Sequence, residues 1–456
     1  MTMKSSFALL PSAIICAVVF LFGCSNRVAQ FDKRWLQPVK VTDSSDMLNE
    51  QVHLFKWQNT IIGLYGDKET KCLLMKNNNS WTEASFSGVS TEYLQGYPSI
   101  DPFNDTILFG QSCWEEGRIT MNVLVGHMAN DLKVRDTIER NWSVDKTALF
   151  GKDDPNIKLV MPGKRYCGGV DIGIINGPDL YIPYHVEGQK VTQWGKKYMT
   201  ENGPASSGVF HSSDSGATWQ MERISDIVAE WPSVLRTENF YYYISPRGIT
   251  PGYELWFSRK PVNGSSWDKP KTLTKTFAFG MGGYYAAVGE GDTAHICWMD
   301  RRHNKWRFNI DAPPIENDDI VYCHRKDSDS RWSKNIDLSK GVLYCYAPSI
   351  SVEGNNVVVA WAGIQNAGKY HTDYDPNDIY YVTSKDSGKT WTKPLKVTDG
   401  AKDGMTAGHP QVMLLNGVVH LFYIQGKMDL QQLSPGLTKL NQPPWPIYYT
   451  QRPFPD

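Results

Sequence analysis

Arginine residues stand at the ends of several apolar, strand-like segments of this sequence. Arg165, Arg247, Arg301 and Arg302 are those that could face a common site. A guanidinium group is always charged and can grip a carboxylate through two parallel N–H bonds, so arginines that converge from separate segments suit an acidic ligand. A structural alternative stays open, because Asp300 could form an ion pair with its arginine neighbours at the end of a strand.

Proton-transfer and aromatic groups accompany these arginines. His185 and His409 could act as acid–base groups, although a lone histidine at a strand edge more often only makes a hydrogen bond. Trp231 is an aromatic candidate for ligand contact. The chain has 16 Trp and 23 Tyr, and such rings serve both core packing in strands and stacking against sugars.

Two copies of one eight-residue pattern indicate which elements position these groups. Residues 212–219 read Ser-Ser-Asp-Ser-Gly-Ala-Thr-Trp, and residues 384–391 read Ser-Lys-Asp-Ser-Gly-Lys-Thr-Trp. The pattern predicts a tight turn in which the Asp carboxylate accepts backbone N–H bonds, the Gly takes positive φ, and the Trp begins the next strand. The residues concerned are Asp214, Gly216, Trp219, Asp386, Gly388 and Trp391.

Around these turns, the chain repeats a unit of four short strands about every sixty residues, which is typical of a β-propeller. The first strands begin near residues 52, 98, 169, 232, 285, 348 and 410, several with a Pro-Ser-Ile-like start. The predicted fold is therefore an all-β propeller of four-stranded blades. Seven blades are favoured, and six are the alternative.

The last unit lacks a fourth strand, and a matching segment stands at the other end of the chain. Residues 35–43 agree with residues 391–399 at six of nine positions, so the N-terminal strand is expected to complete the last blade and close the ring. The predicted domain organisation is a signal peptide at 1–23, a lipidated Cys24 with a linker at 24–34, and one propeller at 35–456.

Three connections between second and third strands are unusually long, at residues 186–205, 301–318 and 363–377. In a propeller these connections open on the same face as the links from each blade to the next. We expect them to be the walls of a ligand site, with mobile surface loops as the plainer alternative.

The two repeated turns resemble the Asp box of sialidases and related β-propellers. The resemblance covers most of residues 31–456 as architecture, and it implies a glycan ligand. By the family pattern, Glu230 corresponds to the base that activates a tyrosine nucleophile, Tyr346 to that nucleophile, and Arg247 with Arg301 or Arg302 to two of three carboxylate-binding arginines. Such a nucleophile makes chemical sense, because the base can take the phenol proton as the anomeric carbon is attacked.

The sequence also departs from the family pattern. The first arginine of the triad and the acidic aspartate have no convincing match, the nearest candidate for that arginine being Arg34 before Trp35. Glu230 and Tyr346 each lie one residue further from the strand than the pattern requires, with Trp231 and Ala347 in the expected places. One residue reverses the side to which a regular strand directs a side chain.

Three hypotheses for function follow. The first is a glycoside hydrolase that acts on an acidic or decorated glycan. The second is a lyase that cleaves uronate-containing polysaccharides by elimination, in which arginine neutralises the carboxylate and His185, His409 or Tyr166 moves protons. The third is a propeller that binds glycans without cleaving them.

The N-terminus predicts export. An apolar run from residue 13 to residue 22 has the length of a signal-peptide core, and it ends in Leu-Phe-Gly-Cys24, which resembles a bacterial lipobox. Cys24 is therefore expected to carry lipid and to anchor the protein in a membrane. The following Ser25 favours the outer membrane by resemblance, on an undetermined side.

Composition excludes several other partners. The chain has 47 basic and 48 acidic residues, so it lacks the basic excess that nucleic acid would require. No strand-placed phosphate loop is found, and no cofactor is expected. No metal is expected either: six cysteines remain beyond Cys24 without C-x-x-C spacing, and buried free thiols are favoured over a zinc site. Their pairing and the oligomeric state stay open.

Overall fold

The computed structural model consists almost entirely of β-strands. Within residues 29–455 it describes all residues except 42–52, 58–59, 67–70, 78–79, 86–98, 101–105, 116–117, 130–133, 151–156, 160–165, 170–173, 177, 195–196, 227–230, 250–251, 278–284, 304–317, 365–376 and 428–445. Glu230, Arg165, Cys24 and the predicted signal peptide therefore lie outside the described residues.

The first three groups of strands are antiparallel and follow chain order. They comprise β2 (His53–Trp57), β3 (Thr60–Gly66), β4 (Lys71–Asn77) and β5 (Ser80–Ser85); β6 (Ser99–Ile100), β7 (Thr106–Glu115), β8 (Arg118–Met128) and β9 (Val134–Asp145); and β12 (Ile174–Asn176), β13 (Asp179–Trp194), β14 (Lys197–Ser212) and β15 (Gln220–Ser225). Two short strands add to these sheets: β10 (Ile157–Leu159) pairs with β13, and β11 (Tyr166–Gly169) pairs with β7. The helix α1 (Lys146–Phe150) follows β9.

Four further groups complete the described strands. They comprise β16 (Ser233–Arg236), β17 (Phe240–Ile249), β18 (Gly252–Pro261) and β19 (Lys271–Phe277); β20 (Tyr285–Glu290), β21 (Thr293–Asp300), β22 (Asp319–Lys326) and β23 (Ile336–Asp337); β24 (Leu343–Glu353), β25 (Asn356–Ile364), β26 (Asp378–Ser384) and β27 (Leu395–Lys396); and β28 (Met405–Leu415), β29 (Val418–Lys427), β30 (Ile447–Pro453) and β1 (Val39–Lys40). A short 3₁₀ helix, η2 (Ala401–Asp403), precedes β28.

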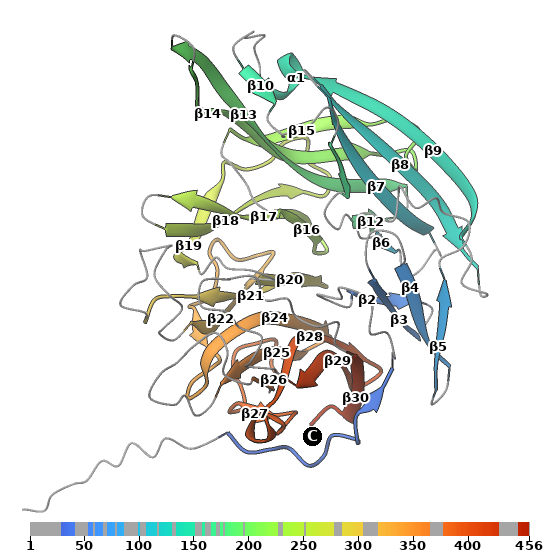
Figure 1. The fold of residues 1–456 in the computed structure, drawn as a ribbon, viewed down its shortest axis with the longest axis vertical. Coiled ribbons are helices and arrows are strands. Elements are labelled where there is room, and N and C mark those ends of the chain that lie inside the picture. The colour runs from blue at the N-terminus through green and yellow to red at the C-terminus, as the bar shows by residue number, and fades with distance from the viewer. Residues whose placement is uncertain are drawn as a thin grey trace, which may run out of the picture.

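The sheets are arranged around a common centre, toward which their first strands lie (Figure 1). Each first strand contacts the first strand of the next group, from β2 through β6, β12, β16, β20 and β24 to β28, and β28 in turn contacts β2. The ends of strands from distant parts of the chain are thereby brought together near the centre.

One predicted connection has regular structure. Residues 186–205 were expected to be a wall of the site or a mobile surface loop, and β13 and β14 continue through them as a long hairpin in which Val191 pairs with Thr200. The segment includes Val191 and Thr192 in β13 and Tyr198 and Thr200 in β14, whose strand preference and cross-strand pairing favour the extension. The other two predicted loops lie mostly outside the described residues.

The core between neighbouring sheets is built by strands in which apolar and polar residues alternate and by strands that are apolar throughout. Trp298, Trp361 and Trp256 are fully buried, and all side chains of β21 and β26 are buried. Burying one large apolar side chain contributes about 1.5–3 kcal/mol, so these central strands fix the relative position of the sheets. Cys297, Cys323 and Cys345 are free, buried thiols, and burial raises the pKa of each.

The repeated turns have the predicted aspartate hydrogen bonds and glycine conformations, but neither Trp begins the next strand, since β15 starts at Gln220 and β27 at Leu395. Asp214 accepts hydrogen bonds from the backbone N–H and the hydroxyl of Thr218 at 2.7 and 2.6 Å, and Asp386 accepts the same bonds from Thr390 at 2.8 and 2.6 Å. Gly216 and Gly388 take φ values of 86° and 84°. The half-buried rings of Trp219 and Trp391 each donate to the carbonyl of that glycine at 3.0 Å. Both turns join a third strand to a fourth strand, at the end of the sheets opposite to the links between second and third strands.

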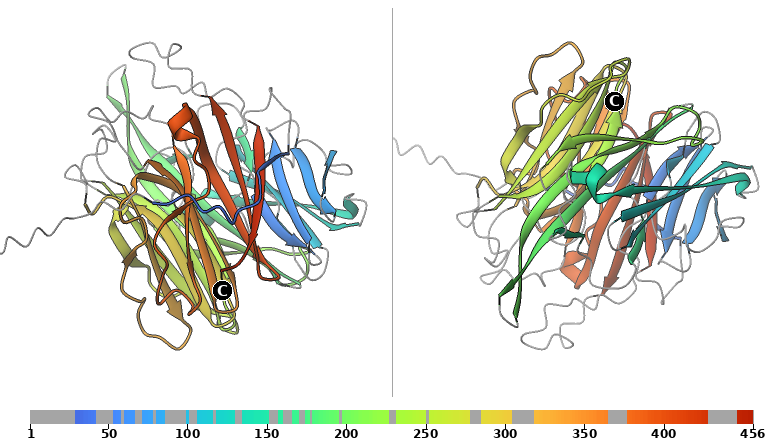
Figure 2. Two further views of the ribbon diagram at one scale, coloured as in Figure 1. Left: turned by 90° about the horizontal axis from the view of Figure 1, so that it is seen from below. Right: turned by 90° about the horizontal axis from the view of Figure 1, so that it is seen from above.

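Residues 29–41 form an extended segment, here called the N-terminal strap, along the outer edge of the last two groups (Figure 2). Phe31 forms a bridge with Lys396 of β27, and β1 pairs with β30. The buried carboxylate of Asp32 accepts hydrogen bonds from Arg34, Tyr381 and Arg452. Residues 29–34, expected to be a linker, are thus packed against the sheets. Among the described residues, no helix has the length and apolar character needed to span a membrane.

Candidate functional site

The same unusual backbone conformation recurs in three first-strand segments, just before β16 and inside β24 and β28. Trp231, Ala347 and His409 each precede a proline, and their φ values are 43°, 50° and 49°. A residue before proline prefers extended backbone with negative φ, so each of these positions costs about 1–3 kcal/mol that the surrounding fold must offset. Repeated strain of this kind, at equivalent positions of three groups of strands, is typical of positions where a site is shaped.

In β24 this conformation belongs to a β-bulge. Tyr346 pairs with Ala362, whereas Ser349 pairs with Ala360, so β24 contains one residue more than its partner over this interval. A bulge interrupts the alternation of side chains and re-aims those beside it. The offset of Tyr346 from the sialidase pattern therefore does not decide where its ring points. β28 has a corresponding shift between Gly408 and Gln411.

The bulges bring Tyr346 and His409 together. Their ring centroids lie 6.0 Å apart in an edge-to-face arrangement. The Nδ2 of Asn377 donates to the phenol oxygen at 3.1 Å. A Cβ atom on Gly408 would lie only 2.9 Å from that oxygen, so the absence of a side chain there lets the phenol approach the backbone of β28. Tyr346 thus touches residues from the two groups that follow each other at the end of the chain.

Both groups are uncharged at neutral pH. Burial raises the pKa of Tyr346 to about 12, although the bond from Asn377 opposes the shift. Burial lowers the pKa of His409 to about 4, and its Nδ1 atom is buried without a hydrogen-bond partner among the described residues. A protonated phenol beside an unprotonated imidazole can donate and accept a proton, respectively.

The Asp300–Arg302 pair has the geometry of a structural ion pair. Arg302 donates from Nε and Nη2 to the two oxygens of Asp300, both at 2.8 Å, and Asp300 is fully buried. Trp298 Nε1 and Thr276 Oγ1 donate to the same carboxylate, each at 2.8 Å. Burial alone would raise the pKa of Asp300, but the bonds and charge of Arg302 outweigh it and lower the pKa.

The other two predicted arginines also face carboxylates. Arg247, near the end of β17, forms an ion pair with Glu254, whose side chain is buried. Arg301 Nε lies 3.4 Å from Asp318 Oδ1. The three arginines therefore occupy the predicted ends of their strands, but a protein carboxylate already compensates each charge.

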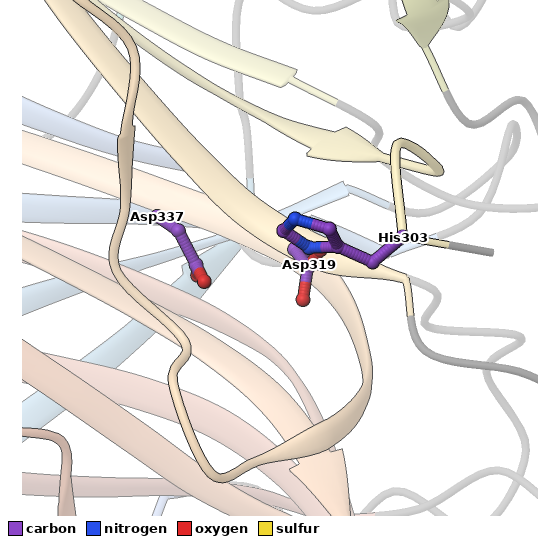
Figure 3. Close-up of side chains that lie close together, drawn as sticks. All are labelled: His303, Asp319 and Asp337. Carbon is purple, nitrogen blue, oxygen red and sulfur yellow. The ribbon is translucent and has the colours of Figure 1, made fainter.

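A group that the sequence did not reveal lies beside Arg301 and Arg302. His303 Nδ1 is 2.6 Å from Asp319 Oδ2, and donor atoms of His303, Asp319 and Asp337 all lie within 4.8 Å of one another. Figure 3 shows the imidazole close to the Asp319 carboxyl group, with Asp337 reaching toward them from a neighbouring strand. The Asp319 side chain is buried, whereas that of His303 is 58 % exposed.

The surroundings of Asp319 favour its protonated form. Burial, followed by the charge of Asp337, raises the pKa of Asp319 to about 6, while the hydrogen bond with His303 opposes the shift. A carboxyl group with this pKa can donate a proton near neutral pH. The three donor atoms are also spaced closely enough for a cation to bridge them. A cation would keep Asp319 ionised and would prevent proton donation.

His303, Asp319 and Asp337, here called the trio, are connected to the strand of Tyr346 by a backbone hydrogen bond. The N–H of Cys345 donates to the carbonyl oxygen of Asp318 at 3.1 Å, and these residues directly precede Tyr346 and Asp319. The three positions of the trio are far apart in the sequence and none belongs to a motif, so only the pairing of β22 with β21 and β23 reveals them. A histidine three residues after Asp300, in the Asp-Arg-Arg-His run of residues 300–303, was the available signal.

Two other predicted residues are placed without joining this group. Burial lowers the pKa of His185, in β13, to about 4. Trp231 is 52 % exposed, and its carbonyl oxygen accepts a hydrogen bond from Tyr285 at 2.8 Å. The side chain of Tyr166, like Glu230 and Arg165, is outside the described residues.

No family model and no curated protein sequence matches this chain. Among solved structures, it is similar to the phage phi92 endosialidase, with 10 % identity over 93 % of this chain and 70 % of that chain and a TM-score of 0.42. It is also similar to the NanB sialidase from Streptococcus pneumoniae, with 10 % identity, coverage of 92 % and 70 %, and a TM-score of 0.38. For the intramolecular trans-sialidase from Ruminococcus gnavus, identity is 11 %, coverage 84 % and 92 %, and the TM-score 0.36. Similarities at this level assign neither family nor activity.

Proposed function

We propose that this chain is an exported glycoside hydrolase that acts on an acidic or decorated glycan. The observation that carries the proposal is a buried carboxyl group, Asp319, whose pKa is raised to about 6 beside an exposed His303. Glycosidases need a carboxylic acid that stays protonated near neutral pH to give a proton to the leaving oxygen. Asp319 supplies the acidic aspartate for which the sequence offered no match.

The remaining roles follow from position in the site. Tyr346 and His409 would contact the sugar beside the reacting bond, and Glu230 remains the predicted base. Arg247, Arg301 and Arg302 would bind the glycan with whatever hydrogen-bonding capacity their carboxylate partners leave. Because those partners compensate their charge, we expect weaker recognition of a substrate carboxylate than three uncompensated arginines would give.

Elimination is a second candidate, and a specific observation favours it. Tyr346 and His409 are adjacent and uncharged, which suits a pair that transfers protons to and from a uronate ring. Among the described residues, Asn377 rather than a carboxylate makes the recorded hydrogen bond to the phenol. A tyrosine with a raised pKa is a better proton donor than nucleophile.

The proposed architecture is a seven-bladed propeller whose last blade is completed by the N-terminal strand. The unbroken cycle of contacts between first strands, together with the pairing of β1 with β30, supports this architecture. We further propose that Cys24 carries lipid and anchors the protein in the outer membrane. The lipobox-like sequence that ends at Cys24 supports the anchor.

Product analysis separates the candidate functions. The protein without its lipid anchor, residues 25–456, would be incubated with sialylated and uronate-containing glycans, and the products followed by mass spectrometry. Hydrolysis adds water to the released sugar, elimination leaves an unsaturated uronate, and binding without any product would refute catalysis. Treatment with a chelator is the control for Asp319, because a requirement for a divalent cation would make the trio a metal site and overturn its role as an acid.

A further inference from the structure

The N-terminal strap carries an unusual concentration of exposed apolar side chains. Phe31, Leu36 and Val39 are 44 %, 56 % and 58 % exposed, and they are three of the five large hydrophobic residues recorded as exposed among the described residues. Single exposed apolar residues are normal on a protein surface, whereas three within nine residues mark a surface that contacts a protein or a membrane.

The exposed charges on the strap have one sign. Lys33, Arg34 and Lys40 are exposed, although Arg34 donates to both oxygens of Asp32, the only acidic residue of the strap, which is buried. Apolar side chains among lysine and arginine, without an exposed carboxylate, are the composition of segments that lie in the interface of an anionic membrane.

The strap is held in place by the sheets behind it. The backbone N–H of Leu36 donates to the Gln451 carbonyl at 3.1 Å, and Thr450 Oγ1 donates to the Leu36 carbonyl at 2.7 Å. The ring of Trp35 packs edge-on against Tyr381, with centroids 5.3 Å apart. The exposed side chains are therefore presented on a fixed backbone, and contact with a surface would not require the strap to fold first.

The distance from the predicted anchor restricts what this surface can meet. Ala29 follows Cys24 by five residues, which span at most about 18 Å even when fully extended. If Cys24 carries lipid, the start of the strap must therefore lie within this distance of the membrane interface. This step depends on the lipid anchor proposed above.

We propose that the N-terminal strap docks on the anchoring membrane, with Phe31, Leu36 and Val39 inserted among the phospholipid headgroups and Lys33 and Lys40 near their phosphates. The strap runs beside β27 and β30, at the periphery of the sheets, whereas Tyr346 and His409 belong to β24 and β28, first strands that lie toward the centre (Figures 1 and 2). Docking by the strap would hold the molecule edge-on and leave the centre of the sheets accessible to a large glycan.

Depth-dependent quenching tests the docking. The mature lipidated protein would carry an environment-sensitive fluorophore on Leu36→Cys, in vesicles of phosphatidylethanolamine and phosphatidylglycerol that contain nitroxide-labelled lipid. Ile138→Cys is the matched control, because Ile138 is an apolar residue of β9 with 46 % exposure. Protein without either substitution is treated with the same fluorescent reagent, and this control measures the background labelling of the native cysteines. Mass spectrometry of the N-terminal peptide reports whether Cys24 carries lipid.

We expect quenching at position 36 to be several-fold stronger than at position 138. Equal quenching at the two positions, with lipid present on Cys24, would overturn the docking and leave the anchor standing. Absence of lipid on Cys24 would overturn the anchor and the docking together. A second copy of the chain or another protein covering the strap would protect position 36 from a water-soluble quencher but not expose it to the lipid-borne one, and that result also contradicts the proposal.

Discussion

Replacing Asp300 by Asn tests whether Arg302, beside the candidate site, has a structural role as the ion-pair partner of Asp300. Asp300 is fully buried and accepts hydrogen bonds from Arg302, Trp298 and Thr276. The amide keeps one acceptor oxygen but turns an NH₂ group toward donors, and it leaves the Arg302 charge without its counterion. Every donor that surrounded the carboxylate then competes for one oxygen.

The expected cost follows from the burial of the pair. Removing one partner of a buried ion pair costs about 3–5 kcal/mol. The Arg302 side chain is 27 % exposed, so water can solvate part of its charge, and we expect a loss near the lower end, about 3 kcal/mol of unfolding free energy. Denaturant unfolding followed by tryptophan fluorescence measures this loss, and Arg302→Met in a double-mutant cycle isolates the pair.

The same substitution should change the pH dependence of stability. The pKa of Asp300 is lowered in the folded protein, so its contribution is present above the ordinary carboxyl pKa of about 4 and is lost as pH falls through the folded value. Asp300→Asn should therefore lose less stability on acidification than the wild type does. A substitution that changes unfolding free energy by less than about 0.5 kcal/mol would refute the structural role.

Two further substitutions test the repeated turn and a buried ion pair. A Cβ atom on Gly388, at φ 84°, would lie 1.9 Å from the Tyr322 hydroxyl, so Gly388→Ala should cost about 1–3 kcal/mol more than Gly417→Ala, at φ 70° with no atom within 4 Å. Equal denaturation midpoints for the two variants would contradict this steric account. Burial alone would raise the pKa of Glu222, but its hydrogen bonds lower it to about 2, and Lys260 Nζ lies 2.7 Å from its carboxylate. Glu222→Gln should cost about 3 kcal/mol near neutral pH. Because the folded pKa is depressed, this cost should shrink as pH falls from about 4 toward 2, and a pH-independent difference in unfolding free energy would argue against it.

The sequence predicted what depends on local pattern. The turns at Asp214 and Asp386 recur because Ser, Asp, Gly and Thr at fixed spacing satisfy one another within eight residues. The second strands were predictable for the same reason, since short apolar runs with β-branched residues, such as that of β25 (Asn356–Ile364), favour a buried strand. The hairpin through residues 186–205 was missed because the segment lacks the regular apolar alternation that marks a strand.

The candidate site was only partly predictable because it depends on contacts between distant strands. Ordering along the repeat placed Tyr346 and His409 at one end of their strands, but the bulges that bring them together could not be inferred from alternation. The raised pKa of Asp319 results from its burial and from Asp337 on another strand, and neither is visible in the local sequence. The ion pair of Arg247 with Glu254 likewise required the register of β17 with β18.

Turnover of Asp319→Asn against pH tests the central claim most directly. Asp319 would act as an acid only while protonated, so the wild-type turnover number should fall as pH rises through about 6. Asp319→Asn should lower the turnover number about 10²–10⁴-fold and abolish its fall with rising pH, while substrate binding persists. Asp386→Asn, in a repeated turn away from the site, is the matched control and should lower stability but not turnover. A folded Asp319→Asn protein with wild-type turnover and an unchanged pH profile would contradict the account.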